Sequence, residues 1–243
     1  METTLNSLSI GNIQLFQPKN GYRYSIDPIL LARFVKVESG VQVVDLGTGC
    51  GIIPIILAQN DNVAKFTGIE CQSELATCAI ENVKLNGLRE RVDICHADIR
   101  DAHNFINPNS IDLIVSNPPY RRVGTGKIAP DNVRAAARHE LAGGLLEFVG
   151  VAKRLLKHGG RYAVIYLPER LSELMVAMST AGIEPKRLRL VYAYRGAAAK
   201  MVLLEGRKGG NPGLEIESPL YIYTDGDSCR DYTDEILQMY NGG

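Results

Sequence analysis

The feature that most constrains the fold is a glycine-rich turn between a predicted strand and a predicted helix. The apolar segment Val41–Leu46 predicts a buried strand, Asp45-Leu-Gly-Thr-Gly-Cys-Gly51 follows, and Ile52–Gln59 predicts a helix. Glycine permits positive φ angles and lets a ligand lie against the backbone, and a helix start presents N–H groups without partners. A doubly wound sheet binds its ligand at this position. The turn therefore predicts an α/β fold with a ligand site at the carboxyl edge of its sheet.

Strands and helices alternate along the rest of the chain, which is typical of a parallel sheet. We expect a Rossmann-like doubly wound sheet, mostly parallel, that ends in an antiparallel hairpin because no helix separates its last two strands. Asp27 is expected to cap a short helix that has Pro28 at its first position. The remaining predicted strands are 64–70, 92–96, 112–116, 161–167, 187–194, 200–205 and 220–223, and the remaining predicted helices are 73–86, 144–157, 168–182 and 231–240.

Length and composition favour one main domain with two appendages. The 243 residues predict an N-terminal leader over 1–40 that covers the cofactor site, a catalytic domain over 41–208 and a small acidic tail over 209–243. Lys+Arg and Asp+Glu both number 27, so net charge gives no argument for nucleic acid. No apolar run is long enough for a membrane span, and neither metal-ligand spacing nor a C-x-x-C pair occurs. We expect a cytoplasmic protein without a metal site, and the oligomeric state stays open.

Acidic residues follow three of the predicted strands. Asp45 precedes the glycines, Glu70 ends the second strand and is suited to two ribose hydroxyls, and Asp98 after the third strand is suited to an adenine amino group. The spacing G-x-G-x-G differs from the G-x-G-x-x-G of nicotinamide-binding folds. S-adenosylmethionine fits better, because its aminoacyl group carries an ammonium and it has no pyrophosphate. A turn in which glycine serves packing alone is the alternative.

The sharpest motif in the chain is Asn117-Pro-Pro-Tyr120, directly after the strand 112–116. Two prolines fix φ and remove backbone donors, so the turn presents carbonyl acceptors and the Asn117 side-chain oxygen in a set geometry. A planar amino group has a delocalised lone pair and is a poor nucleophile. The Asn117 side-chain oxygen and the Pro118 carbonyl would accept hydrogen bonds from its two N–H groups. These bonds would aim the lone pair at a methyl group and stabilise the developing positive charge. Tyr120 would stack on a flat substrate.

These motifs together resemble class I S-adenosylmethionine-dependent methyltransferases that act on planar amino nitrogens. Within them, the leader Phe16–Leu31 and the stretch Ala137-Arg-His-Glu140 are similar to the tRNA(Val) adenine-N6 methyltransferase family. The resemblance implies a catalytic set of Asn117, Pro118 and Tyr120. It implies a cofactor set of Asp27, Asp45, Gly47, Gly49, Gly51, Glu70, Cys71, Asp98, Ile99 and Asn117, and a substrate set of Tyr120, Arg121, Arg122 and Arg138.

A basic loop follows the Asn-Pro-Pro-Tyr turn. Residues 121–138 hold five basic side chains and one acidic side chain, which favours contact with a phosphate backbone in tRNA or another structured RNA. Lys186, Arg187, Arg189, Arg195 and Lys200 add positive charge near the terminal hairpin, whereas the tail is acidic. Four alternatives stay open, namely a protein glutamine amide, guanine N2 in rRNA, adenine in DNA, and a noncatalytic binding module. An ordinary solvated loop whose arginines pair with the acidic tail is the alternative to RNA contact.

Overall fold

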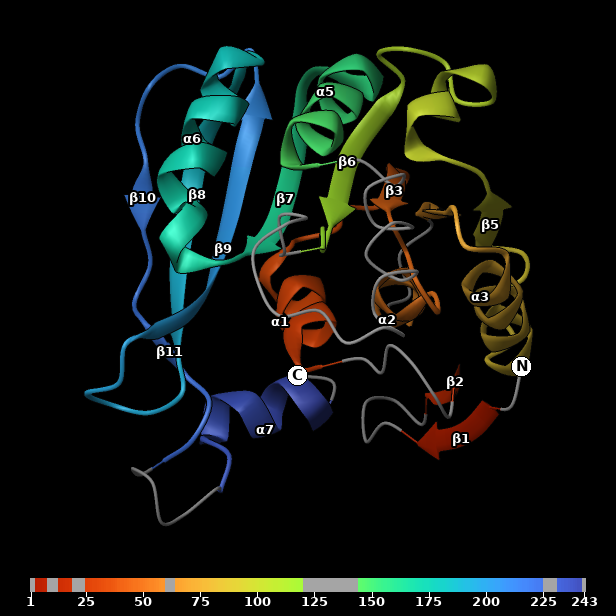
Figure 1. Ribbon diagram of the computed structural model, residues 1–243, viewed down its shortest axis with the longest axis horizontal. Coiled ribbons are helices and arrows are strands. Elements are labelled where there is room, and N and C mark those ends of the chain that lie inside the picture. The colour runs from red at the N-terminus through yellow and green to blue at the C-terminus, as the bar shows by residue number, and fades with distance from the viewer. Residues whose placement is uncertain are drawn as a thin grey trace, which may run out of the picture.

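A nine-stranded sheet forms the centre of the computed structural model of the chain (Figure 1). The strand order is β10-β8-β9-β7-β6-β3-β4-β5, and β11 pairs with β8 outside this path. The structure describes residues 3–7, 13–18, 25–59, 64–119, 144–224 and 231–241. The strands of this sheet are β3 (Gln42–Leu46), β4 (Lys65–Glu70), β5 (Val92–His96), β6 (Ile111–Ser116), β7 (Leu156–Tyr166), β8 (Ile183–Tyr192), β9 (Ala199–Lys208), β10 (Glu215–Ile216) and β11 (Leu220–Tyr221).

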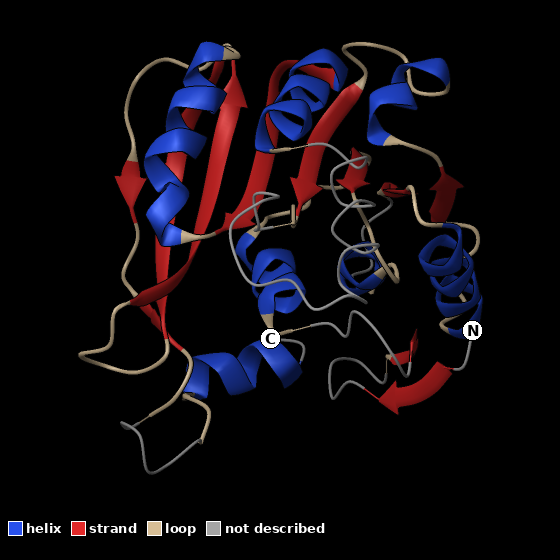
Figure 2. Ribbon diagram, in the orientation of Figure 1, coloured by secondary structure: helices blue, strands red, loops and turns tan. Residues whose placement is uncertain are grey.

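Helices cover the sheet and connect its parallel strands (Figure 2). Among the described residues, none of them combines the length and apolar character needed to cross a bilayer. The α-helices are α1 (Asp27–Phe34), α2 (Ile52–Ala58), α3 (Ser73–Leu85), α5 (Leu145–Leu155), α6 (Leu171–Thr180) and α7 (Asp234–Asn241), and the 3₁₀ helices are η1 (Ile99–Asn104) and η2 (Pro168–Arg170).

The topology confirms a Rossmann-like, mostly parallel sheet with a terminal antiparallel hairpin. β3 pairs in parallel with β4 on one side and with β6 on the other, whereas β9 is antiparallel to both β7 and β8. The chain runs from β3 outward to β5 and then returns to β6, so the strand order reverses between β3 and β6. Ligands bind at such a switch point. Leu46 pairs with Ser116, and so the glycine turn and the Asn-Pro-Pro turn leave the sheet side by side.

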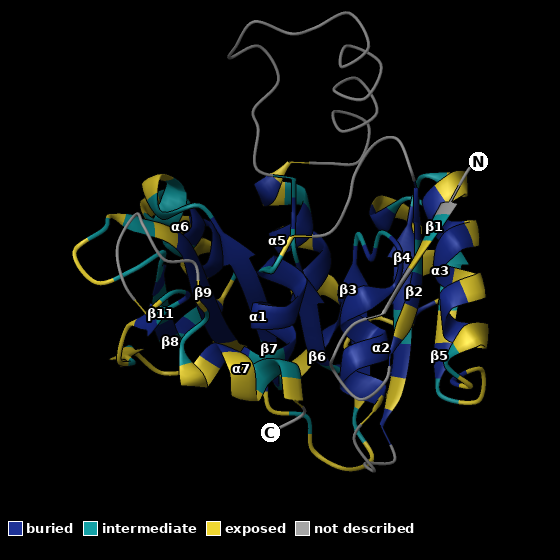
Figure 3. Ribbon diagram, turned by 90° about the horizontal axis from the view of Figure 1, so that it is seen from below, coloured by how far each residue is buried: buried dark blue, intermediate teal, exposed yellow. Residues whose placement is uncertain are grey.

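The core consists of two layers, one on each face of the sheet. Alternate strand residues enter opposite layers, as Val43 and Val44 of β3 do, because successive side chains of a strand point to opposite faces. One layer packs the sheet against α1 and α2, and the other packs it against α5 and α6. Figure 3 shows the sheet buried between these helices. Burial on both faces explains why the central strands are almost continuously apolar.

Two local predictions are wrong at element boundaries. Asp27 does not cap α1: Ile26 is the N-cap, its carbonyl accepts from the N–H groups of Ile29 and Leu30, and Asp27 is the first helical residue. An acidic side chain is also favourable there, because it faces the positive end of the helix dipole. The strand predicted at 161–167 begins earlier, at Leu156, so Gly159 and Gly160 lie inside β7. Gly159 has a φ of 79°, so the strand begins with an irregular segment that glycine permits.

The leader and the tail contain pairing that the sequence pattern does not reveal. A separate antiparallel pair joins β1 (Thr3–Ser7) to β2 (Gln14–Pro18). In the tail, β10 and β11 both pair in parallel with β8, and Ile236 of α7 is fully buried in the main core. The Arg33 Nε donates to the Met239 carbonyl over 2.8 Å, which ties α7 to α1. The division at residues 40 and 208 stays a prediction.

Candidate functional site

The glycine turn is anchored to the neighbouring strand β4. The N–H groups of Gly47 and Thr48 both donate to the Ile69 carbonyl over 2.9 Å. Gly47, Gly49 and Gly51 have φ angles of 73°, 57° and 80°, a region that other residues rarely adopt. A Cβ at Gly49 would meet no atom within 4 Å, so this part of the turn borders open space. The turn therefore combines a fixed backbone with room for a ligand against it.

Asp45 is a buried carboxyl group beneath the turn. Its exposed fraction is 1%, and the Thr48 hydroxyl donates to its Oδ2 over 2.6 Å. Its Oδ1 is buried and has no hydrogen-bond partner among the residues that the structure describes. Burial raises the pKa of Asp45 to about 7, the Thr48 hydrogen bond opposes this rise, and the negative charge of Glu70 adds to it. A cationic group beside Oδ1 would satisfy this atom and favour the carboxylate.

Glu70 lies at the end of β4 and holds the glycine turn directly. Its Oε2 accepts from the Gly49 N–H and its Oε1 accepts from the Gln72 N–H, both over 2.9 Å. The side chain is buried, with 5% exposure. A carboxylate has about four acceptor sites, so Oε2 keeps capacity for another donor, whereas Oε1 also accepts a long, weak bond from the Cys71 thiol. Glu70 thus orders the turn and still suits a pair of ligand hydroxyls.

Asp98 lies at the same sheet edge, after β5, but it is already paired. It caps η1 by accepting from the Arg100 N–H over 2.9 Å, and the Arg100 guanidinium binds both of its oxygens, over 2.9 and 2.7 Å. The hydrogen bond from the Arg100 side chain is the main cause that holds the pKa of Asp98 below its ordinary value. An incoming amino group must share Asp98 with Arg100 or displace it.

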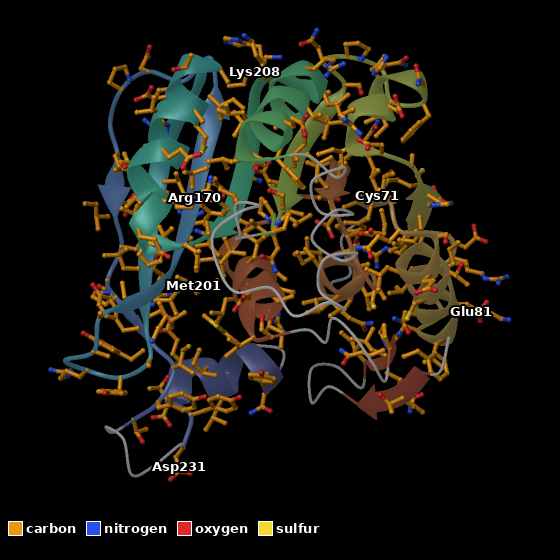
Figure 4. All side chains as sticks on the ribbon, viewed as in Figure 1. Cys71, Glu81, Arg170, Met201, Lys208 and Asp231 are labelled. Atoms are coloured by element: carbon orange, nitrogen blue, oxygen red, sulfur yellow. The ribbon has the colours of Figure 1, made fainter. Side chains whose placement is uncertain are left out.

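Three further residues of the expected cofactor set also lie on described elements. Cys71, labelled in Figure 4, follows β4. Its thiol lies 3.7 Å from the Glu70 Oε1. Ile99 is the buried first residue of η1. Asp27 is a buried residue at the start of α1, a helix that packs against α2. The structure thus brings Cys71 and Ile99 to the edge that carries Glu70 and Asp98, and the roles of all three stay predictions.

The Asn-Pro-Pro turn continues β6 at the switch point. Pro118 is buried, and Asn117 is half-buried. Directly before them, the Ser116 Oγ and the Tyr162 Oη form a fully buried hydrogen bond of 2.7 Å between β6 and β7. Burial raises the pKa of Tyr162, so its hydroxyl stays protonated. Tyr120, Arg121, Arg122 and Arg138 lie outside the described residues.

Tyr162→Phe is expected to lower the free energy of unfolding by about 1–3 kcal/mol, because it leaves the buried Ser116 hydroxyl without its partner. The double variant Ser116→Ala/Tyr162→Phe removes both polar groups, so its loss should be smaller than the sum of the two single losses. Urea unfolding of the four proteins in this cycle measures the coupling. Strictly additive losses would show that this bond does not stabilise the strand end.

The sequence analysis missed Thr48 and Gly68 as parts of this site. Thr48 satisfies one oxygen of Asp45, and its spacing three residues after an acidic residue is the available signal. A Cβ at Gly68 in β4 would lie 2.8 Å from the Thr48 Cγ2, closer than real contacts allow. Glycine within a strand often marks such a close approach. Gly68 therefore makes room for the threonine that supports Asp45.

Most basic residues near the terminal hairpin bind other groups of this protein. Arg187 binds Glu217 over 2.7 Å and Glu205 over 3.3 Å, and its guanidinium lies 4.4 Å from the centre of the Phe34 ring. Arg189 binds Glu235 over 2.7 Å, and the Lys186 ammonium donates to the Asn211 carbonyl. Arg187 and Arg189 thus fasten the acidic tail to β8. These ion pairs neutralise part of the positive charge that the sequence predicts near the hairpin.

The carboxyl edge fits S-adenosylmethionine in three respects. Asp45 presents a buried oxygen without a partner, which suits an ammonium group. Glu70 has spare acceptor capacity beside the glycine turn, which suits ribose hydroxyls. Gly49 leaves the space that a side chain would fill. The structure brings these three residues and Asn117 to one edge of the sheet.

Comparison with known proteins agrees with this fit. The family model for the methyltransferase small domain matches residues 26–177. A protein of Tolumonas auensis named tRNA1(Val) (adenine(37)-N6)-methyltransferase is 32% identical over 202 residues, which cover 82% of each chain. A protein of the same name from Actinobacillus pleuropneumoniae serotype 7 is 29% identical and covers 91% of this chain and 89% of its own.

Solved structures confirm the fold. The crystal structure of a predicted O-methyltransferase from Agrobacterium tumefaciens superposes with a TM-score of 0.71 at 20% identity, and the match covers 89% of this chain and 96% of that chain. The crystal structure of TrmN from Thermus thermophilus gives a TM-score of 0.55 at 23% identity, over 74% of this chain and 48% of that chain. At these identities the likeness concerns the fold alone.

Proposed function

Because the chain belongs to the methyltransferase small domain family and is an S-adenosylmethionine-dependent methyltransferase, we propose that it methylates the exocyclic N6 of adenine in tRNA. The observation that carries the proposal is the pairing of Leu46 with Ser116, which sets Asn117-Pro-Pro next to the glycine turn. Relatives of about 30% identity that bear the name of a tRNA adenine-N6 methyltransferase support it.

The reaction needs a planar amino group to be held and oriented. In our proposal, the Asn117 side-chain oxygen and the Pro118 carbonyl accept hydrogen bonds from the two N–H groups of adenine N6. They aim its lone pair toward the glycine turn and stabilise the positive charge that develops on nitrogen. No strong base is required, because the proton leaves after the nitrogen has become cationic. Tyr120 is proposed to stack on the base.

The cofactor is proposed to lie along the carboxyl edge. When bound, S-adenosylmethionine supplies an electrophilic methyl group on a sulfonium. Asp45 would bind the ammonium, and Glu70 would bind the ribose hydroxyls. The backbone of Gly47, Gly49 and Gly51 would line the cofactor. Further members of the proposed set are Asp27, Cys71, Asp98, Ile99 and Asn117.

The RNA contact is proposed to lie in the basic segment 121–138. Arg121, Arg122 and Arg138 follow the base-binding turn in sequence and would bind phosphates of a structured RNA. Lys200 at the start of β9 and Arg195 between β8 and β9 are further candidates, although the Arg195 guanidinium also lies 5.8 Å from the centre of the Tyr221 ring in the tail. A cytoplasmic location is part of this proposal, because it goes with a tRNA substrate.

Arg121→Glu combined with Arg122→Glu is expected to weaken tRNA binding and to flatten its salt dependence, because fewer phosphates are neutralised. Binding measured at several salt concentrations gives both quantities. Lys36→Glu/Lys65→Glu serves as the charge-matched control, since both lysines are exposed, Lys36 follows α1 and Lys65 begins β4 at the end opposite to its carboxyl end. If Arg121→Glu/Arg122→Glu has the same salt dependence of tRNA binding as the wild type, this segment does not contact the RNA.

The function is tested by a labelling experiment. The protein is incubated with methyl-labelled S-adenosylmethionine and with total tRNA, rRNA, DNA and protein from a strain that lacks this gene, and the labelled product is digested and identified. We expect label in N6-methyladenosine from tRNA. Label in glutamine of a protein, in guanine N2 of rRNA or in adenine of DNA would replace the proposed substrate, and no label in any fraction would contradict turnover.

A further inference from the structure

A buried asparagine in α3 connects three separate parts of the chain. Asn82 has an exposed fraction of 0%. Its Oδ1 accepts from the Phe16 N–H over 2.6 Å, and its Nδ2 donates to the Phe16 carbonyl over 3.0 Å and to the Cys50 carbonyl over 2.9 Å. Phe16 belongs to β2 of the N-terminal hairpin, and Cys50 belongs to the glycine turn. One side-chain amide thus binds the hairpin and the turn at the same time.

The contact with Cys50 completes a set of bonds that fix the glycine turn. The Gly49 N–H is held by Glu70, the Gly51 N–H donates to the Thr48 carbonyl over 3.0 Å, and the Cys50 carbonyl between them is held by Asn82. The peptide planes of the turn are therefore fixed on both sides of Cys50. The same side of the turn is covered by Phe16, which packs against the cluster of Cys50, Leu75 and Cys78.

A second asparagine, Asn86 at the C-cap of α3, makes the same kind of two-bond contact with β2. The Oδ1 of Asn86 accepts from the Gln14 N–H over 3.1 Å, and its Nδ2 donates to the Gln14 carbonyl over 2.7 Å. The two asparagines thus pair with alternate residues of β2 as a neighbouring strand would. Of the two, Asn82 bonds to the glycine turn, whereas the bonds of Asn86 go to Gln14 and to its own helix.

We propose that Asn82 is a positioning residue for the cofactor, because it couples the docking of the N-terminal hairpin to the conformation of the glycine turn. This role rests on the proposed placement of S-adenosylmethionine at that turn. A buried amide whose oxygen and both N–H donors are engaged is more specific than an apolar side chain, which would fill the same space without fixing the Cys50 carbonyl. Binding to an already ordered turn avoids the entropy of ordering it, so loss of Asn82 raises the Kd.

The test compares Asn82→Ala with Asn86→Ala in the full-length protein. Each variant removes one of the two asparagine contacts with β2, and Asn82→Ala also releases the Cys50 carbonyl. Calorimetric titration with S-adenosylhomocysteine measures binding, and thermal melting measures stability. We expect Asn82→Ala to weaken binding about tenfold and Asn86→Ala to change it less than about twofold. With saturating S-adenosylmethionine, kcat of Asn82→Ala should stay near the wild-type value while KM for the cofactor rises.

Asn82→Leu provides a second variant of nearly equal size if alanine at this position does not fold. It fills the space without fixing the Cys50 carbonyl, so it should weaken binding about as much as alanine. Equal Kd values for the Asn82 and Asn86 variants would overturn the proposal, since loosening of the hairpin alone would then account for the whole loss of affinity. An unchanged Kd for Asn82→Ala would overturn it as well. Absence of binding to the wild type would instead overturn the placement of the cofactor, and with it this role.

Discussion

Asn117→Ala is expected to reduce methyl transfer roughly 10²- to 10³-fold, while binding of S-adenosylhomocysteine falls far less because Asn117 is only one of several residues proposed to line the cofactor. An oriented acceptor that stabilises charge at the reacting atom contributes about this much to a rate. Alanine removes the side-chain oxygen and leaves the two prolines, so the course of the turn is retained. The loss should therefore appear mainly in kcat and much less in the affinity for the cofactor.

Two variants make this result specific. Asn117→Asp keeps an acceptor of the same size but adds a charge, so it should retain more activity than alanine. Asn104→Ala, at the exposed end of η1, is the matched control and should leave kcat unchanged. Calorimetry with S-adenosylhomocysteine and single-turnover kinetics separate binding from chemistry. Wild-type activity of Asn117→Ala would rule out the proposed role of the turn.

The parts of the site that sequence analysis predicted depend on local pattern. The glycine turn follows a strand and precedes a helix, and Asn117-Pro-Pro follows another strand, so both motifs carry their own structural context. Parallel strands expose their carboxyl ends at one edge, which places Glu70 and Asp98 beside these motifs without further information. The carboxyl-edge arrangement therefore follows from element order and the fold class.

The parts that it did not predict depend on contacts between distant residues. The pairing of β10 and β11 with β8 and the ion pair of Arg187 with Glu217 join segments that are remote in sequence. Two-residue strands such as β10 carry no alternation that a pattern could detect. Asp98 illustrates the same limit within the site, because its pairing with Arg100 depends on a side-chain conformation. Asn82 is a polar residue on the buried face of α3, near the end of the helix, and this break in the apolar face was its available signal.

Binding of S-adenosylmethionine is expected to depend on pH through Asp45. Burial raises the pKa of this carboxyl group to about 7, so the cofactor-free protein holds it mainly protonated below that pH. Because its pKa is raised, ionisation opposes folding, and Asp45 lowers the stability of the cofactor-free protein as pH rises from about 4 to about 7. An ammonium beside the unpartnered Oδ1 has the opposite preference, since it favours the carboxylate. Cofactor binding below pH 7 therefore requires Asp45 to release a proton.

The affinity should accordingly fall by up to about tenfold for each pH unit below 7, and it should fall again above about pH 8, where an α-amino group loses its proton. Asp45→Asn should abolish the fall in affinity below pH 7. It should also weaken binding at pH 7.5 by roughly 10- to 100-fold, because a neutral amide cannot replace a charge-assisted bond to an ammonium. Calorimetry in buffers of different ionisation enthalpy counts the protons released. The count should approach one per bound molecule near pH 6 and zero near pH 7.5, and a count of zero at both pH values would place the ammonium away from Asp45.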